Sequence, residues 1–219
     1  IKNVDLDLLI GFEFKWITGK YVIKITMTEY DTKIENFMLS NIVDKKNLTI
    51  LEFGVREGTS TKKFVKHCEV NGGIVYSVDI NDCSNILISK HWKFLHSRDD
   101  NFDYIVKNLP EELDLIYLDS FHNANHVKKI FYYYYKMLKK DGVFYFDDIS
   151  NIPYLKDNYR NNFNCEINNF ETFNLLLEIL RNNKENIDLY FSFVGSGMAK
   201  ILKKNNKNLN EPKKILSRK

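Results

Sequence analysis

The chain has 219 residues, 44% of them hydrophobic and 28% charged, which suits one soluble α/β domain with a sizeable core. No apolar run approaches the roughly 20 residues that a membrane-spanning helix needs. The first residues lack the apolar stretch of a secretion signal. The cysteines, Cys68, Cys83 and Cys165, are odd in number and widely spaced, so neither a disulfide framework nor a zinc site is predicted. We expect a cytoplasmic protein with free thiols.

The charge is distributed unevenly along the chain. Residues 203–219 hold seven lysines and arginines and one glutamate, a net +6, so residues 1–202 carry −3 of the total of +3. An acidic body argues against nucleic-acid binding. Residues 204–219 are therefore expected to form a solvated, disordered tail, with contact to RNA or to an acidic partner as the alternative.

Residues 1–45 precede the first strongly predicted buried strand. Two strand-like runs, 12–16 and 21–25, are separated by a Thr-Gly-Lys turn and predict a small hairpin, and residues 31–43 predict a helix. We interpret this segment as a cap over an active site or as a contact between copies of the chain, which leaves a homo-oligomer open.

The stretch that follows carries the most information. An apolar run predicts a buried strand at 48–53, and two glycines, Gly54 and Gly58, then lead into a predicted helix at 60–70. A strand that turns through glycines into a helix leaves backbone N–H groups free at the start of the helix. That geometry suits a cofactor whose tail lies close to the backbone.

Two acidic residues accompany this turn. Asp79 follows 21 residues after Gly58, at the end of a predicted strand at 74–79, where it can accept hydrogen bonds from both hydroxyls of a ribose. Glu52 stands two residues before Gly54, where a carboxylate favours the cationic end of a cofactor and repels a pyrophosphate. The pair predicts a nucleoside cofactor with a cationic tail and disfavours a nicotinamide-dependent dehydrogenase.

This pattern resembles the cofactor loop of class I S-adenosylmethionine-dependent methyltransferases. The resemblance rests on Glu52-x-Gly54-x-x-x-Gly58-x-Ser60, followed by Asp79. It implies that S-adenosylmethionine is bound by Glu52, Gly54, Gly58, Thr59, Ser60 and Asp79. The segment Ser97-Arg98-Asp99-Asp100 stands where such enzymes contact adenine, so Asp99 could accept from the adenine amine; a simple polar loop is the alternative.

Strand-like and helix-like segments alternate from Leu48 to Ile149, which predicts a Rossmann-like, doubly wound, mostly parallel sheet. Gly195-Ser196-Gly197 predicts a C-terminal antiparallel hairpin and completes seven strands, as the resemblance implies. The further strands are expected at 93–96, 113–118, 143–147, 188–194 and 198–203, and the further helices at 83–90, 101–108, 123–139 and 170–182. The methyltransferase domain would span 46–203, with a substrate-binding loop at 149–169.

Three aspartates stand at the ends of two of these strands. Asp119 follows the fourth predicted strand, and Asp147 and Asp148 end the fifth. Neighbouring parallel strands end at the same edge of a sheet, so the three carboxylates should converge beside the cofactor. Close carboxylates repel one another unless a cation lies between them. Mg²⁺ would satisfy this requirement; the alternative is that the aspartates cap the following helix and loop.

Asp119-x-x-His122 together with Asp147-Asp148 resembles metal-dependent O-methyltransferases acting on sugars of macrolide antibiotics, and the cephalosporin hydroxylase-like group around them. The resemblance implies that the three aspartates hold the ion and that His122 is the general base, with His126 as a competing candidate. A helix start and a nearby cation would lower the pKa of His122 and keep its imidazole neutral.

Together with the resemblance, these patterns predict methyl transfer from S-adenosylmethionine to a hydroxyl of a small molecule such as a sugar or glycoside, assisted by Mg²⁺. Asp119 and His122 would be catalytic. Two alternatives stay open, a cephalosporin hydroxylase-like protein without methyl transfer and a non-catalytic protein that binds the cofactor.

Overall fold

The computed structural model of the chain describes residues 13–17, 20–24, 29–150 and 163–211. Near its start, β1 (Glu13–Ile17) and β2 (Lys20–Lys24) pair antiparallel, which confirms the predicted hairpin. No helix in the described ranges is long and apolar enough to cross a membrane.

Seven strands form the central sheet, in the order β5-β4-β3-β6-β7-β9-β8. Strand β9 is antiparallel to both of its neighbours, whereas the pairs from β5 to β7 are parallel. This confirms the doubly wound, mostly parallel sheet with its C-terminal hairpin. The strands are β3 (Leu48–Phe53), β4 (Gly73–Asp79), β5 (Trp92–His96), β6 (Leu113–Leu118), β7 (Leu138–Asp147), β8 (Ile187–Ser192) and β9 (Met198–Lys203).

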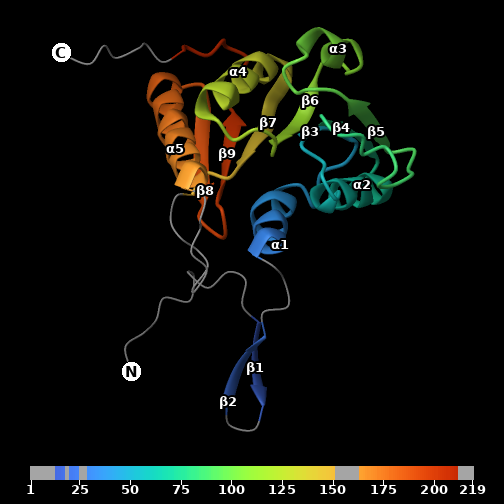
Figure 1. Ribbon diagram of the computed structural model, residues 1–219, viewed down its shortest axis with the longest axis vertical. Helices are drawn as coiled ribbons and strands as arrows, with labels where there is room; N and C mark the ends of the chain where they lie inside the picture. The colour runs from blue at the N-terminus through green and yellow to red at the C-terminus, as the bar shows by residue number, and fades with distance from the viewer. Residues whose placement is uncertain (1–12, 18–19, 25–28, 151–162, 212–219) are drawn as a thin grey trace, which may run out of the picture.

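Helices cover both faces of the sheet (Figure 1). One face carries α1 (Glu29–Lys33), which continues through a π-helical turn to Met38, and α2 (Thr59–Asn71). The other carries α3 (Phe102–Lys107), α4 (Ala124–Tyr134) and α5 (Phe163–Asn183). The core is accordingly divided into two buried clusters, one on each side of the sheet.

Strand alternation decides which side chains meet which helices. In β3, Leu51 and Phe53 pack in the cluster under α3 to α5, and Ile50 packs in the cluster under α1 and α2. Tyr117 of β6 and Tyr145 of β7 belong to the same cluster as Ile50. The acids two residues after these tyrosines are therefore on the side of the sheet that α1 covers.

Two predicted helices differ from the structure. Residues 83–90 form turns, not a helix, and Asp82 accepts a hydrogen bond from the backbone N–H of Ser84, a local contact that competes with helix formation. The predicted helix at 123–139 ends with a 3₁₀ turn at Met137 because Leu138 is buried and pairs with Leu113. The expected glycine stop at Gly142 consequently lies inside β7.

Two further observations concern the ends of the predicted domain. Residues 204–211, expected to begin a disordered tail, contact the body: Lys204 pairs with Asp188, and Asn183 accepts a hydrogen bond from the backbone of Asn210. The predicted loop at 149–169 overlaps the start of α5, and its residues 151–162 lie outside the described part of the chain.

Candidate functional site

The glycine turn after β3 has a backbone that other residues would disrupt. Gly54 has a φ of +91°, and a Cβ there would lie 1.9 Å from the carbonyl oxygen of Asp119. Gly58 is the N-cap of α2 with a φ of +76°, and a Cβ there would lie 2.5 Å from Ile86. Both positions favour glycine, and Gly54 brings the turn directly against the end of β6.

Glu52 secures this turn from inside the protein. Its buried carboxylate accepts hydrogen bonds from the hydroxyls of Ser60 (2.5 Å), Thr61 (2.7 Å) and Ser77 (2.7 Å). Burial raises the pKa of Glu52 to about 7, although the hydroxyls oppose that shift. Two of the predicted cofactor residues, Glu52 and Ser60, thus bond to each other, and the first residue of α2, Thr59, is exposed.

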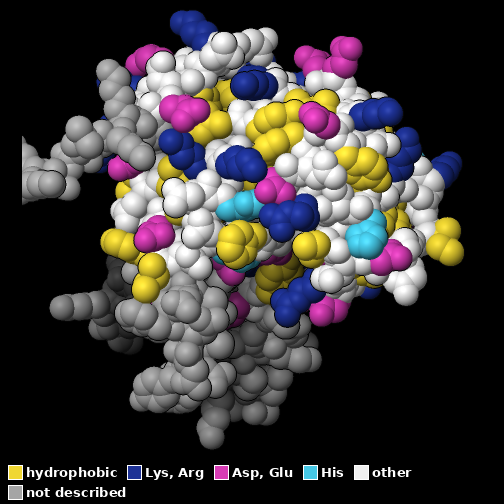
Figure 2. Space-filling view, turned by 45° about the horizontal axis from the view of Figure 1, so that its top comes forward, with side chains coloured by type: hydrophobic (Ala, Val, Ile, Leu, Met, Phe, Trp, Pro, Cys, Tyr) yellow, Lys and Arg dark blue, Asp and Glu magenta, His cyan; other side chains and the backbone are white. Residues whose placement is uncertain are grey.

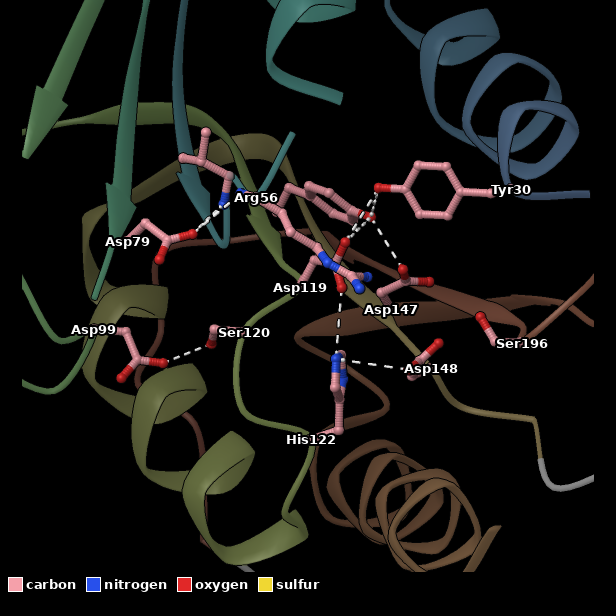
Figure 3. Close-up of polar contacts among 12 residues, drawn as sticks. Tyr30, Arg56, Asp79, Asp99, Asp119, Ser120, His122, Asp147, Asp148 and Ser196 are labelled. Carbon is pink, nitrogen blue, oxygen red and sulfur yellow. Dashed lines mark hydrogen bonds and ion pairs between the residues drawn. The ribbon is translucent and has the colours of Figure 1, made fainter. Parts of the chain in front are cut away.

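Asp79 holds the outer side of the same turn. Its Oδ2 accepts from the backbone N–H groups of Val55 (2.8 Å) and Arg56 (3.1 Å), and its Oδ1 accepts from Asn81 (2.8 Å). Figure 3 shows the carboxylate facing the Arg56 backbone, whose φ is +54°. The acid predicted to bind a ribose therefore lies at the turn and supports its path.

A cavity of about 450 Å³ opens where the parallel strands end, which is where ligands bind in open α/β sheets. It brings together four of the predicted site residues, and its lining includes Gly54, Asp79, Asp99, Asp119, Ser120, Phe121 and His126. A larger groove, of about 650 Å³, lies between α4 and α5 and contains none of the predicted site residues.

Asp99 belongs to the cavity wall and forms a pair with His126. It accepts from the Ser120 hydroxyl at 2.6 Å and lies 2.8 Å from Nε2 of His126. Burial alone would raise the pKa of Asp99, but these two partners lower it. Because His126 is engaged here, it lies with the predicted adenine contact and not with the acid cluster.

The three predicted metal ligands meet on the α1 side of the sheet (Figure 3). The Tyr117 hydroxyl lies 3.2 Å from a carboxylate oxygen of Asp119 and 3.2 Å from one of Asp147. The Tyr30 hydroxyl of α1 donates to Asp119 at 3.1 Å. We call Asp119, Asp147 and Asp148 the acid cluster.

A cation missed by the sequence reasoning lies in this cluster. The ammonium group of Lys33, the last residue of α1, forms an ion pair with Asp147 and lies 4.0 Å from Asp148. It also donates to the Ser196 hydroxyl at 2.7 Å. Lys33 is buried, and no local sequence pattern marks it as a partner of acids more than 100 positions away.

His122 is a second cationic partner of the cluster. Its Nε2 lies 3.5 Å from Asp119 and 3.6 Å from Asp148. Burial lowers the pKa of His122, but the carboxylates outweigh burial and raise it to about 9. The prediction of a lowered pKa is therefore wrong, because His122 precedes Asn123, the N-cap of α4, and faces the acids.

These contacts decide how well the cluster suits a divalent ion. Mg²⁺ needs oxygen ligands in a near-octahedral arrangement, and here an ammonium group lies among the carboxylates. A divalent ion 4 Å from an ammonium is opposed by about 8 kcal/mol at an effective dielectric constant of about 20. No three His, Cys, Asp or Glu side chains of the described residues are grouped as metal ligands. The cluster as built does not fit Mg²⁺.

Charged side chains of both signs are mixed on one face of the molecule (Figure 2). On the face drawn in Figure 2, basic and acidic side chains are interspersed among the coloured residues. That face therefore lacks the broad basic patch that binds a phosphate backbone.

Comparison with known proteins adds independent information. Residues 51–149 match the family model described as a methyltransferase domain. No curated protein matches the chain. Among solved structures, a methyltransferase of Podospora anserina bound to S-adenosylhomocysteine is similar at a TM-score of 0.61 and 19% identity, covering 77% of each chain.

Two further structures share the fold. A putative caffeoyl-CoA O-methyltransferase from Staphylococcus aureus is similar at a TM-score of 0.59 and 17% identity, covering 82% of this chain and 85% of that one. The MycE methyltransferase of the mycinamycin pathway, solved with Mg and S-adenosylhomocysteine, has a TM-score of 0.61 and 17% identity. That match covers 84% of this chain but only 52% of MycE. Residues 51–149 thus match a methyltransferase domain, and the glycine turn and seven-stranded sheet have the fold of these methyltransferase structures.

Proposed function

We propose that the protein transfers the methyl group of S-adenosylmethionine to a hydroxyl of a small molecule. The observation that carries this proposal is the position of Asp119. It lines the cavity below the glycine turn, and its carboxylate also belongs to the acid cluster. A methyl donor in the cavity and a hydroxyl at the cluster would therefore be neighbours.

The chain's own residues can position both reactants. Gly54 and Asp79 both line the cavity, so a cofactor bound there would lie beside the turn's backbone and meet a carboxylate at its edge. The reaction is an in-line displacement in which the acceptor oxygen attacks the methyl carbon and the sulfonium sulfur leaves as a thioether. Holding the two groups in line supplies much of the catalysis.

The acceptor proton needs a base at the cluster. His122 remains the proposed base, and it must first lose its own proton because the carboxylates hold its pKa at about 9. Asp119, 3.5 Å away, would orient the ring. A sugar or glycoside acceptor, and assistance by Mg²⁺, stay predictions; MycE was solved with mycinamycin VI and Mg, but the ammonium of Lys33 opposes a metal here.

The test begins with cofactor binding. Calorimetry should show S-adenosylhomocysteine binding at micromolar levels or tighter, and Asp79→Ala should weaken binding by about 1–3 kcal/mol through the lost hydrogen bonds. Preference for NAD would contradict the assignment of the cofactor.

Acceptor use is tested separately. Labelled S-adenosylmethionine should transfer methyl to members of a panel of sugars, glycosides and phenols. Binding of the cofactor without transfer to any hydroxyl would favour a cephalosporin hydroxylase-like or non-catalytic role.

A further inference from the structure

We propose that Lys33 is a built-in counter-ion of the acid cluster, standing where a divalent ion was predicted, so that the site needs no metal. The inference deepens the proposed function and rests on it for the reaction that the cluster serves. Its structural content, an ammonium group in place of a metal ion, can be tested without any turnover.

The position of Lys33 is fixed by the helix that carries it. Tyr30 and Lys33 are three residues apart and therefore lie on one face of α1. Tyr30 donates to Asp119, while Lys33 pairs with Asp147 and lies 4.9 Å from the centre of the Tyr30 ring. Ile34 and Met38 follow as fully buried residues that hold the helix against the sheet.

The ammonium group donates two hydrogen bonds and lies near a second carboxylate. One N–H donates to Asp147 and another to Ser196, and Asp148 lies 4.0 Å away. Ser196 is held in place by the hairpin turn, since its carbonyl accepts from the backbone N–H of Ser150 at 2.8 Å. Two segments far from α1 in the sequence, the end of β7 and the β8–β9 turn, thus hold Lys33, whereas a chance surface pair has a single partner.

Cationic groups of the chain offset most of the cluster's negative charge without an added ion: Lys33 and a protonated His122 together offset two of the three carboxylates. Asp147 faces Lys33, and His122 lies between Asp119 and Asp148. Each carboxylate has a cationic partner from the chain within 4.0 Å. A divalent ion at the cluster would have to displace Lys33 from its buried position and from its ion pair with Asp147.

The experiment measures Mn²⁺ binding by electron paramagnetic resonance on the full chain. The wild type should show no site at the cluster, and Lys33→Ala should gain one and bind Mn²⁺ at least about tenfold more tightly, because the opposing charge is gone. Lys33→Arg is the matched control and should bind no better than the wild type. Lys33→Ala with Asp147→Asn should lose the gained site.

Binding of S-adenosylhomocysteine verifies that each variant is folded. Wild-type Mn²⁺ binding that Asp147→Asn abolishes would overturn the proposal, and that measurement does not depend on a Lys33 variant. A folded Lys33→Ala that gains no Mn²⁺ site would overturn it as well. A failure of the proposed function would look different. The Mn²⁺ measurements would then come out as expected, but the protein would not bind the cofactor or would not transfer methyl.

Discussion

The two halves of the site are built in different ways. The half around Glu52 and Asp79 comes from one continuous β3–α2–β4 unit and is held by hydroxyls and backbone N–H groups. The half around the acid cluster comes from α1, β6, β7 and the β8–β9 turn and is held by charges. The first half is a local scaffold, whereas the second exists only when distant segments meet. Variants that remove one contact in each half test this difference.

The largest effect is expected from breaking the Lys33–Asp147 pair. Lys33→Met should lower the free energy of unfolding by about 3–5 kcal/mol, because it leaves a buried carboxylate without its partner. Urea denaturation measures this. Lys63→Met is the matched control, since Lys63 pairs with Glu35 of the same helical segment at the surface, and its loss should amount to about 0–1 kcal/mol. Equal losses would show that burial of the pair does not matter.

Removing the proposed base tests the chemistry of the charged half. His122→Ala should reduce the rate of methyl transfer by roughly 10²–10⁴, with little change in affinity for S-adenosylhomocysteine. The wild-type rate should rise with pH up to about 9, the pKa at which His122 loses its proton. His126→Ala is the control. If the rate does not change with pH over this range, a carboxylate of the cluster and not His122 accepts the proton of the acceptor hydroxyl.

Glu52 tests the half that is held by hydroxyls and backbone N–H groups. Glu52→Ala should cost about 2–4 kcal/mol of unfolding free energy, because three buried hydroxyls lose their acceptor. Glu52→Gln should cost less, since the amide oxygen still accepts and a pKa near 7 means that the native site tolerates a neutral group. Thermal and urea unfolding would compare the two variants. Equal costs would mean that charge, not hydrogen bonding, holds this half.

A smaller effect is expected in the pH dependence of stability. The folded pKa of His122, about 9, is above the ordinary value of 6.5, so its contribution is complete below pH 6.5 and is lost as pH rises through 9. Its share is no more than about 3 kcal/mol. Unfolding measured from pH 6 to 9.5 should show this decline, and His122→Gln should flatten it. If the free energy of unfolding of His122→Gln falls with pH as steeply as that of the wild type, a group other than His122 causes the decline.

The parts of the site that could be predicted are those whose residues lie close together in the sequence or at the ends of neighbouring strands. The strand at 48–53, the turn at Gly54 and Gly58, and the acid at Asp79 were all readable because they follow local periodicity and spacing. The acids at the ends of β6 and β7 were readable because parallel neighbours end at one edge of a sheet. The false helix at 83–90 shows the limit of that reasoning, since a side-chain contact from Asp82 favours turns there.

The order of strands and helices, the glycine turn and the acids beside it can be predicted from residue patterns, because each depends on neighbouring residues. The cation that those acids meet depends instead on how distant segments pack together. Lys33 and Asp147 are 114 positions apart, and no local pattern encodes such a contact. The pKa of His122 was decided in the same way, since the carboxylates that raise it come from two different strand ends. Charges act through space, so their partners are known only when the chain has folded.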